Sequence, residues 1–135
     1  MNILFTRFPL ESAHGGAEVQ TLALAEGLKK KGHTVAFLGN CPTLLERFQV
    51  AGFRCQKLDI GKPPVTKWGA ISFLWRKREM MRRLVEVMCH GEVRRASNHD
   101  TAIFMLSLSE KLLLTDWAVT RGMKVFWIEH DRVGR

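Results

Sequence analysis

Two clusters of residues at opposite ends of the chain are suited to binding a ligand. Near the N-terminus, Gly15 and Gly16 follow a short apolar run and come directly before a helical pattern. Adjacent glycines let a ligand approach the backbone, and the free N–H groups at a helix N-terminus attract phosphate or carboxylate groups. The same pair equally suits a plain strand-to-helix turn that only needs glycine. Anion binding is therefore one of two interpretations of this loop.

The second cluster places four ionisable side chains in a row near the C-terminus. Glu129, His130, Asp131 and Arg132 follow the apolar run 126–128. Four ionisable groups together at one edge of a sheet form a plausible site, and an arginine suits bidentate hydrogen bonding to a phosphate. The alternative is a solvated polar loop after a strand, because loops are polar in general.

Hydrophobic periodicity predicts five strands that alternate with four helices. The expected strands are 2–6, 34–38, 53–58, 102–106 and 124–128. The expected helices are 16–31, 42–50, 66–89 and 110–121, with Ser109 as the N-cap of the last one and glycines at 32, 52 and 122 closing three of them. Parallel neighbouring strands need crossover helices, so this alternation predicts a doubly wound, Rossmann-like α/β fold in one domain.

In a doubly wound sheet, ligands bind beyond the carboxyl ends of the strands. The loops expected at that edge are 7–16, 39–42, 59–66, 107–109 and 129–135. Both clusters fall in these loops, so the fold positions both of them at the ligand-binding edge.

Composition excludes several classes of protein. With 46% hydrophobic residues in 135, the chain can bury a core, and it has neither a signal-peptide pattern nor an apolar run of membrane-spanning length. A cytoplasmic location is the resulting expectation. The three cysteines at 41, 55 and 89 are odd in number and widely spaced, so we expect reduced, structural thiols and no metal site.

The first loop lacks the common cofactor motifs. Residues 14–18 read His-Gly-Gly-Ala-Glu, without G-x-G-x-x-G, and no acidic residue ends the second strand where a ribose would be bound. No G-x-x-x-x-G-K-[ST] motif is present either. Nicotinamide, flavin and P-loop enzymes are therefore disfavoured, and no cofactor is expected.

The same N-terminal residues resemble a known family. An apolar strand at 3–5, the stretch Gly-Gly-Ala-Glu at 15–18, and a helix that ends in Leu-Lys-Lys-Lys-Gly-His-Thr-Val at 28–35 are similar to the N-terminal signature of GT-B-fold retaining glycosyltransferases of family 4, also called glycosyl transferases group 1. Related GT-B enzymes share this signature, so it identifies the group better than the specificity.

The resemblance implies the front part of a two-domain enzyme. Residues 1–135 are similar to roughly the first two-thirds of an acceptor-side N-terminal domain, an incomplete half of the GT-B fold, and the donor-binding domain is absent. Such an enzyme is a hexosyl-type transferase. It moves sugar from a nucleotide-diphosphate sugar to a lipid-linked or polysaccharide acceptor, as in polysaccharide or lipopolysaccharide biosynthesis. The chain alone is then expected to be inactive, either as a fragment or as half of a split enzyme.

The resemblance also suggests roles for individual residues. His130 occupies the place of the family histidine that approaches the donor sugar near its reacting carbon. The expected ligands of donor phosphate or acceptor are Gly15, Gly16, Glu18, Glu129, Asp131 and Arg132.

A basic helix with tryptophans lies in the middle of the sequence. The chain has a net charge of +8, and residues 67–95 contribute eight basic against three acidic side chains. At 100° per residue, one helix face is predicted to pack on the sheet, made of Phe73, Leu74, Met80, Met81, Leu84, Val85 and Met88. The opposite face carries Trp68, Ile71, Trp75, Arg78 and Arg82.

Aromatic rings beside arginines suit the interface of an anionic membrane. Family members often use such helices to stay at the inner membrane face near a lipid-linked acceptor. Equally, the tryptophans can pack on further parts of the domain. No motif for nucleic acid appears, so that partner is disfavoured. The competing function is a non-catalytic Rossmann-like module that binds an anionic membrane or a partner protein.

Overall fold

The computed structural model describes residues 1–8, 16–59, 66–90 and 98–128. The five strands are β1 (Asn2–Arg7), β2 (Thr34–Gly39), β3 (Arg54–Lys57), β4 (Thr101–Met105) and β5 (Lys124–Trp127). The helices are α1 (Gly16–Lys30), α2 (Pro42–Val50), α3 (Lys67–His90) and α4 (Leu108–Thr120), with a short 3-10 turn η2 (Asn98–Asp100) before β4. The predicted alternation of strands and helices is therefore confirmed.

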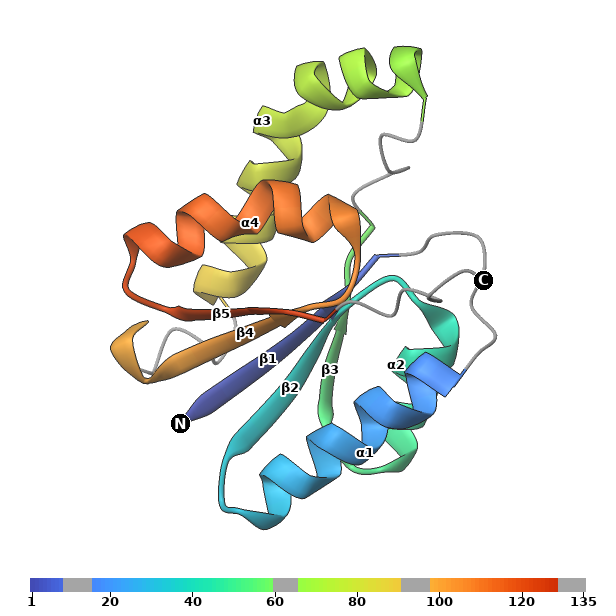
Figure 1. Ribbon diagram of the computed structural model, residues 1–135, viewed down its shortest axis with the longest axis vertical. Coiled ribbons are helices and arrows are strands. Elements are labelled where there is room, and N and C mark those ends of the chain that lie inside the picture. The colour runs from blue at the N-terminus through green and yellow to red at the C-terminus, as the bar shows by residue number, and fades with distance from the viewer. Residues whose placement is uncertain (9–15, 60–65, 91–97, 129–135) are drawn as a thin grey trace, which may run out of the picture.

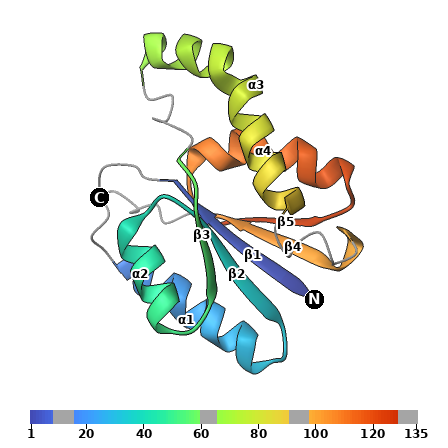
Figure 2. The same ribbon diagram turned by 180° about the vertical axis from the view of Figure 1, so that it is seen from behind.

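All neighbouring strands are parallel, in the order β3-β2-β1-β4-β5. Helices cover both faces of this sheet (Figures 1 and 2). One core cluster joins the sheet to α1 and α2, and a second joins it to α3 and α4. This is the predicted doubly wound, Rossmann-like arrangement, in which β1 lies at the centre.

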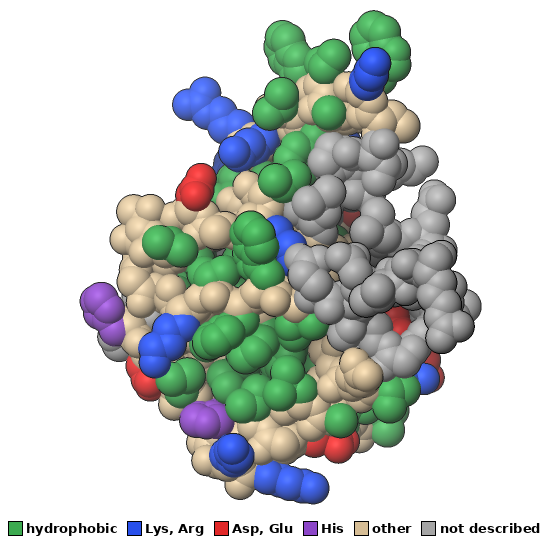
Figure 3. Space-filling view, viewed as in Figure 1, with side chains coloured by type: hydrophobic (Ala, Val, Ile, Leu, Met, Phe, Trp, Pro, Cys, Tyr) green, Lys and Arg blue, Asp and Glu red, His purple; other side chains and the backbone are tan. Residues whose placement is uncertain are grey.

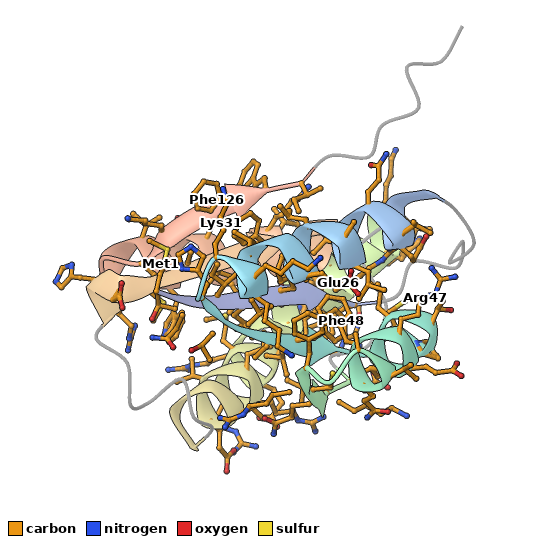
Figure 4. The ribbon with its side chains drawn as sticks, turned by 90° about the horizontal axis from the view of Figure 1, so that it is seen from below. Met1, Glu26, Lys31, Arg47, Phe48 and Phe126 are labelled. Atoms are coloured by element: carbon orange, nitrogen blue, oxygen red, sulfur yellow. The ribbon has the colours of Figure 1, made fainter. Side chains whose placement is uncertain are left out.

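Phenylalanines fill the core on the α1 and α2 side. Phe48 of α2 points toward the sheet (Figure 4), and its ring centroid lies 4.9 Å from that of Phe37 and 5.9 Å from that of Phe5. On the same face, the rings of Phe5, Phe104 and Phe126 stack in sequence across β1, β4 and β5. The aromatic side chains of the chain thus mainly pack against the sheet.

As predicted, a glycine follows the end of three of the helices. Gly32, Gly52 and Gly122 have φ of 88°, 75° and 74°, the left-handed conformation that favours glycine after a helix. These glycines return the chain to the sheet within two or three residues, which keeps the connections on the amino-edge side short.

Two details of the prediction are wrong. Helix α4 starts at Leu108 and its N-cap is Ser107, not Ser109, because the sequence Ser107-x-x-Glu110 forms a capping box. Leu74 does not pack on the sheet, since it is 68% exposed, whereas Phe73, Met80 and Leu84 are the fully buried side chains among those of α3 that the structure describes. Leu74 lies about 100° around the helix from Phe73, which turns it away from the core.

Candidate functional site

The candidate site lies where β1 and β4 run side by side at the centre of the sheet. The chain leaves β1 toward α1 on one face and leaves β4 toward α4 on the other face (Figure 1). This point, at which the strand order reverses direction, is where open parallel sheets bind ligands. The N-termini of α1 and α4 both lie at this carboxyl edge, with their positive dipole ends toward it.

An ion pair joins the end of β1 to the first turn of α1. Arg7 Nη1 lies 2.8 Å from Glu18 Oε1, and the two side chains are only 14% and 3% exposed. The distance is that of an ion pair, although the N–H direction does not meet the geometry of a hydrogen bond. Glu18 therefore serves to hold Arg7 at the carboxyl edge, which leaves little of its carboxylate for a ligand.

On the other side of the point where the strand order reverses, the start of α4 is hydrogen-bonded to the end of β1. Ser107 Oγ donates a hydrogen bond of 2.9 Å to the carbonyl oxygen of Phe8. The Glu110 carboxylate accepts hydrogen bonds from the backbone N–H groups of Ser107 at 2.7 Å and Leu106 at 3.1 Å. Ser107 thus fixes the distance between the two loops that diverge at this point.

Glu110 is the most perturbed titratable group of the described site. Its side chain is fully buried, and its second carboxylate oxygen, Oε2, has no hydrogen-bond partner among the described residues. Burial raises the pKa of Glu110 to about 8, against the opposing effect of the backbone N–H groups and of Lys111. The carboxyl group is thus largely protonated near neutral pH.

Glycine is required at the end of β2. A Cβ atom on Gly39 would overlap the carbonyl oxygen of Arg7. The same carbonyl accepts a hydrogen bond of 3.1 Å from the backbone N–H of Asn40. Gly39 therefore allows the loop after β2 to cross closely over the end of β1, and it sets the position of Arg7.

Helix α4 also anchors the end of β5. Lys111 Nζ donates a hydrogen bond of 3.2 Å to the carbonyl oxygen of Ile128 and lies 5.9 Å from the ring centroid of Trp127. Trp127 Nε1 in turn donates to Thr115 Oγ1 at 3.1 Å. These contacts fix the direction in which the chain leaves β5 toward residue 129.

The structure describes some of the predicted site residues and not others. Gly15, Glu129, His130, Asp131 and Arg132 lie outside the described residues. Gly16 is the first residue of α1, and Glu18 lies in its first turn.

The predicted membrane face is exposed. Trp68, Ile71 and Trp75 on α3 are 83%, 49% and 84% exposed. Arg82 belongs to ion pairs with Glu79 and Glu86, at 2.7 and 3.5 Å. Its charge is therefore largely neutralised within the helix.

Sequence reasoning missed four residues of this edge. Arg7, Ser107, Glu110 and Lys111 position the loops, and none of them was a predicted site residue. The spacing Ser107-x-x-Glu110 is a capping-box signal that identifies two of the four. The partners of Arg7 and Lys111 come from tertiary packing, so no local pattern indicates them.

The described residues contain no group of three or more histidine, cysteine or acidic residues arranged to hold a metal ion. Within the same ranges, no helix combines the length and the apolarity needed to cross a membrane. Cys41 and Cys55 are free thiols, and burial raises the pKa of Cys55, which makes its thiol a weak nucleophile.

Comparison with known proteins supports the fold. By sequence, neither a protein-family model nor a curated protein matches the chain. The structure is similar to a glycosyltransferase from Rickettsia africae, with a TM-score of 0.59 and 17% identity, over 96% of this chain and 29% of that chain. MurG from Acinetobacter baumannii aligns over 99% of this chain and 43% of that one with 15% identity, but its TM-score of 0.43 is too low to support an argument. The chain thus spans under a third of the Rickettsia protein, and the two share the Rossmann-like α/β fold.

Proposed function

We propose that this chain is the acceptor-side N-terminal part of a GT-B glycosyltransferase. The observation that supports this function best is the structural likeness to a glycosyltransferase over 96% of the chain. It agrees with the N-terminal sequence signature and with a ligand edge that presents two helix N-termini. The proposed enzyme moves a hexosyl group from a nucleotide-diphosphate sugar to a lipid-linked or polysaccharide acceptor in the cytoplasm.

The chemistry of transfer explains what such an edge contributes. The bond between the sugar's anomeric carbon and the diphosphate breaks, a bond to the acceptor hydroxyl oxygen forms, and the hydroxyl proton leaves to a base. Positive charge develops on the sugar and negative charge on the diphosphate. The N-terminus of α1 at Gly16, with Arg7 held beside its first turn by Glu18, is suited to an anionic group of donor or acceptor.

The remaining roles belong to residues 129–132. We assign His130 to the donor sugar near its reacting carbon, and Glu129, Asp131 and Arg132 to acceptor hydroxyl and phosphate groups. The donor itself needs a second domain, in the same polypeptide or in a partner chain. Retention of the anomeric configuration and family 4 membership follow from the sequence resemblance alone.

A titration of the 135-residue chain tests ligand binding. We expect a lipid-linked acceptor analogue to shift the amide NMR signals of Gly16, Glu18 and Ser107, since the donor needs a second domain. Gly16→Val should weaken this response because its side chain obstructs the helix N-terminus. Gly27→Ala in the same helix is the matched control, since a Cβ atom there meets nothing within 4 Å. An unchanged spectrum across a panel of lipid-linked and polysaccharide acceptor analogues contradicts the proposal.

Catalysis is tested in the complete enzyme formed with a donor-binding domain. His130→Ala should lower kcat by at least about a hundredfold if the histidine acts on the reacting sugar. A variant that transfers sugar at the wild-type rate would remove His130 from the proposed site.

A second candidate function is a non-catalytic Rossmann-like module that binds a membrane or a partner protein. It is supported by the exposed tryptophans of α3, which a transfer reaction does not require. The same titration separates the candidates, because such a module has no need to bind a sugar acceptor at the carboxyl edge.

A further inference from the structure

The two edges of the sheet differ in how they are protected. Edge strands expose backbone N–H and C=O groups that can pair with another chain, and proteins commonly block them with charged side chains. The β3 edge follows this rule, because it starts with Arg54, ends with Lys57 and contains no large apolar residue. On β5, by contrast, Phe126 and Trp127 are 45% and 56% exposed, and the single charged residue of the strand, Lys124, is its first. The β5 edge is therefore the one that is open to another strand.

The backbone groups of two residues of β5 point toward this open edge. In a strand, successive residues direct their N–H and C=O groups to opposite sides. The N–H of Ile128 donates to the carbonyl oxygen of Met105 in β4 at 3.0 Å, so Ile128 and Phe126 point toward β4. Val125 and Trp127 therefore point away from β4, to a side where no other strand of the described residues lies. Two N–H and two C=O groups are thus left for a partner strand.

The exposed aromatic side chains of β5 are fixed by their neighbours. The ring of Phe126 stacks on that of Phe104 with centroids 4.7 Å apart, and Phe104 stacks on Phe5 at 4.9 Å. On the opposite face of the sheet, the indole N–H of Trp127 donates to Thr115 Oγ1. Figure 3 shows hydrophobic side chains exposed across the middle of the view, where Figure 1 shows β5. Side chains that are already fixed lose little conformational entropy when a partner binds.

We propose that β5 pairs with β5 of a second copy of the chain, antiparallel and about a two-fold axis that passes through Phe126. In this register Val125 lies opposite Trp127 of the second copy, and Phe126 lies opposite its own counterpart. Val125 and Trp127 are equally spaced on either side of the axis, so their outward N–H and C=O groups form four hydrogen bonds between the copies. None of these backbone groups is left without a partner, which makes the edge complementary to itself.

The side chains fit the same register on both faces of the sheet. The two Phe126 residues form a non-hydrogen-bonded pair, with Cα atoms about 4.5 Å apart, and continue the stack of phenylalanines from one sheet into the other. Val125 opposite Trp127 is an aromatic and β-branched pair, a kind that stabilises antiparallel strands. Lys124 lies opposite Ile128, and the two copies of Lys124 are about 13 Å apart along the strands, which exceeds the screening length of about 8 Å. The pairing therefore brings no like charges into contact.

Other occupants of the edge fit less well. Pairing of β5 with β3 of the next copy would bring Arg54 and Lys57 beside Lys124, and it would continue as an open chain of copies. The antiparallel dimer instead closes on itself. Because its two central strands run in opposite directions, the carboxyl edges of the two sheets face opposite ways. The dimer thus leaves the candidate site of each copy open, and it does not depend on the proposed function.

Sedimentation equilibrium of the 135-residue chain tests the pairing. We expect a monomer–dimer equilibrium without larger species at about 0.15 M salt, which screens the net charge of +8 on each copy. A monomer at concentrations up to about 1 mM, or a series of larger assemblies, would overturn the proposal.

Hydrogen exchange on the same samples locates the interface. The amides of Val125 and Trp127 face solvent in the monomer, so they should exchange at least about tenfold more slowly once the concentration favours the dimer. The amides of Cys55 and Lys57 point outward from β3 in the same way and are the control, because their exchange should not depend on concentration. Equal slowing at both edges would contradict a pairing through β5.

Matched variants test the backbone and the side chains separately. Val125→Pro removes an N–H that points to the open edge, so the monomer keeps its bonds to β4 while the dimer loses two of four. It should weaken dimerisation by at least about tenfold, and Lys57→Pro, the same change on the β3 edge, should not. Phe126→Lys places two charges in contact and should have a similar effect, whereas Leu24→Lys, at a 41% exposed site on α1, should not. Equal effects of the test variants and their controls would refute the assignment of the interface.

Cross-linking tests the register. In a non-hydrogen-bonded antiparallel pair the two Cβ atoms are close enough for a disulfide, so Phe126→Cys should yield a covalent dimer on mild oxidation. Lys124→Cys should not, because position 124 lies opposite Ile128 of the second copy. The wild type, treated in the same way, accounts for the three natural cysteines. Cross-linking of Lys124→Cys as fast as that of Phe126→Cys would show that the proposed two-fold pairing is wrong.

Discussion

The buried carboxyl group of Glu110 shows how one residue can serve structure and respond to pH. Oε1 satisfies two backbone N–H groups at the start of α4, while Oε2 has no hydrogen-bond partner in the described part of the chain. Burial of such a carboxyl group costs much free energy when it is ionised and little when it is protonated. The raised pKa is the consequence, and it makes Glu110 a determinant of stability near neutral pH.

Glu110→Gln tests this interpretation. A folded-state pKa of about 8, above the usual 4.5, means that folded protein binds the proton more tightly. Its stabilising effect is present at low pH and is lost as the pH rises through about 8. The variant does not titrate, and glutamine still completes a capping box. We therefore expect its free energy of unfolding to exceed that of the wild type at about pH 9 and the difference to shrink toward about pH 5.

Urea denaturation across this pH range is the measurement, and Glu46→Gln, at an exposed site on α2, is the control. A pH-independent difference between Glu110→Gln and the wild type would refute a raised pKa.

Gly39 is the second residue whose effect is predictable from its surroundings. An added methyl group meets the carbonyl oxygen of Arg7, which is backbone and cannot turn aside. Gly39→Ala should therefore lower the free energy of unfolding by about 2 kcal/mol or more. Gly27→Ala in α1 meets open space and should instead stabilise by about 0.5 to 1 kcal/mol. Chemical denaturation of both variants checks the contrast, and similar values for the two would be inconsistent with it.

At the scale of elements, the contacts of α4 hold the carboxyl edge together. Ser107 begins the helix and binds the end of β1, and Lys111 one residue past the capping box binds the end of β5. One helix terminus thus positions the exits of two strands. The loops that carry the candidate chemistry start from these exits.

Ser107→Ala is expected to affect more than its own helix. It removes a buried hydrogen bond between elements and a helix cap, so the free energy of unfolding should fall by about 2 kcal/mol. Thr66→Ala removes only an exposed cap of α3, whose Oγ1 accepts from Gly69 N at 2.9 Å, and should cost about 1 kcal/mol or less. Hydrogen exchange should also accelerate at Leu106, whose N–H donates to the carbonyl oxygen of Thr6 in β1, in the first variant and not in the second. Unchanged exchange there would show that the Ser107 contact does not hold β1.

At the scale of the whole molecule, stability is distributed from the centre of the sheet outward. β1 is buried along its middle, whereas the edge strands β3 and β5 expose most of their side chains. Phe126 on β5 is 45% exposed and lies at the margin of the sheet in Figure 4. The free energy needed to open the hydrogen bonds of such an edge strand is lower than the free energy needed at the central strand.

Native-state hydrogen exchange should therefore rank the strands. We expect the amides of Leu4 and Phe5 to exchange only through global unfolding, and those of Gln56 and Phe126 to exchange at least about tenfold faster. Uniform exchange across the five strands would contradict this order. If the glycosyltransferase function is correct, a donor-binding domain that covers β5 should slow the exchange of Phe126 and leave Phe5 unchanged.

The sequence by itself determined the elements and their arrangement. Alternating apolar runs, helix-ending glycines and Pro42 at the start of α2 act locally, so they predict α2 to the residue and the other elements within about two residues. The parallel sheet follows because crossover helices separate the strands. Local signals also indicated that Trp68, Ile71 and Trp75 face away from the core, since helical periodicity sets the angle between a face and its opposite.

Only the tertiary structure decided how the residues of the candidate site are used. Glu18 was predicted to bind a ligand, and in the folded chain its carboxylate pairs with Arg7, which is eleven positions away in the sequence. Arg82 was assigned to the membrane face, but its charge is taken up by Glu79 and Glu86. Burial of Glu110 and the approach of Gly39 to Arg7 depend on strands that meet only in the folded sheet. Which side chains pair with each other and which are buried depends on the packing of the folded chain, so no local sequence pattern predicts it.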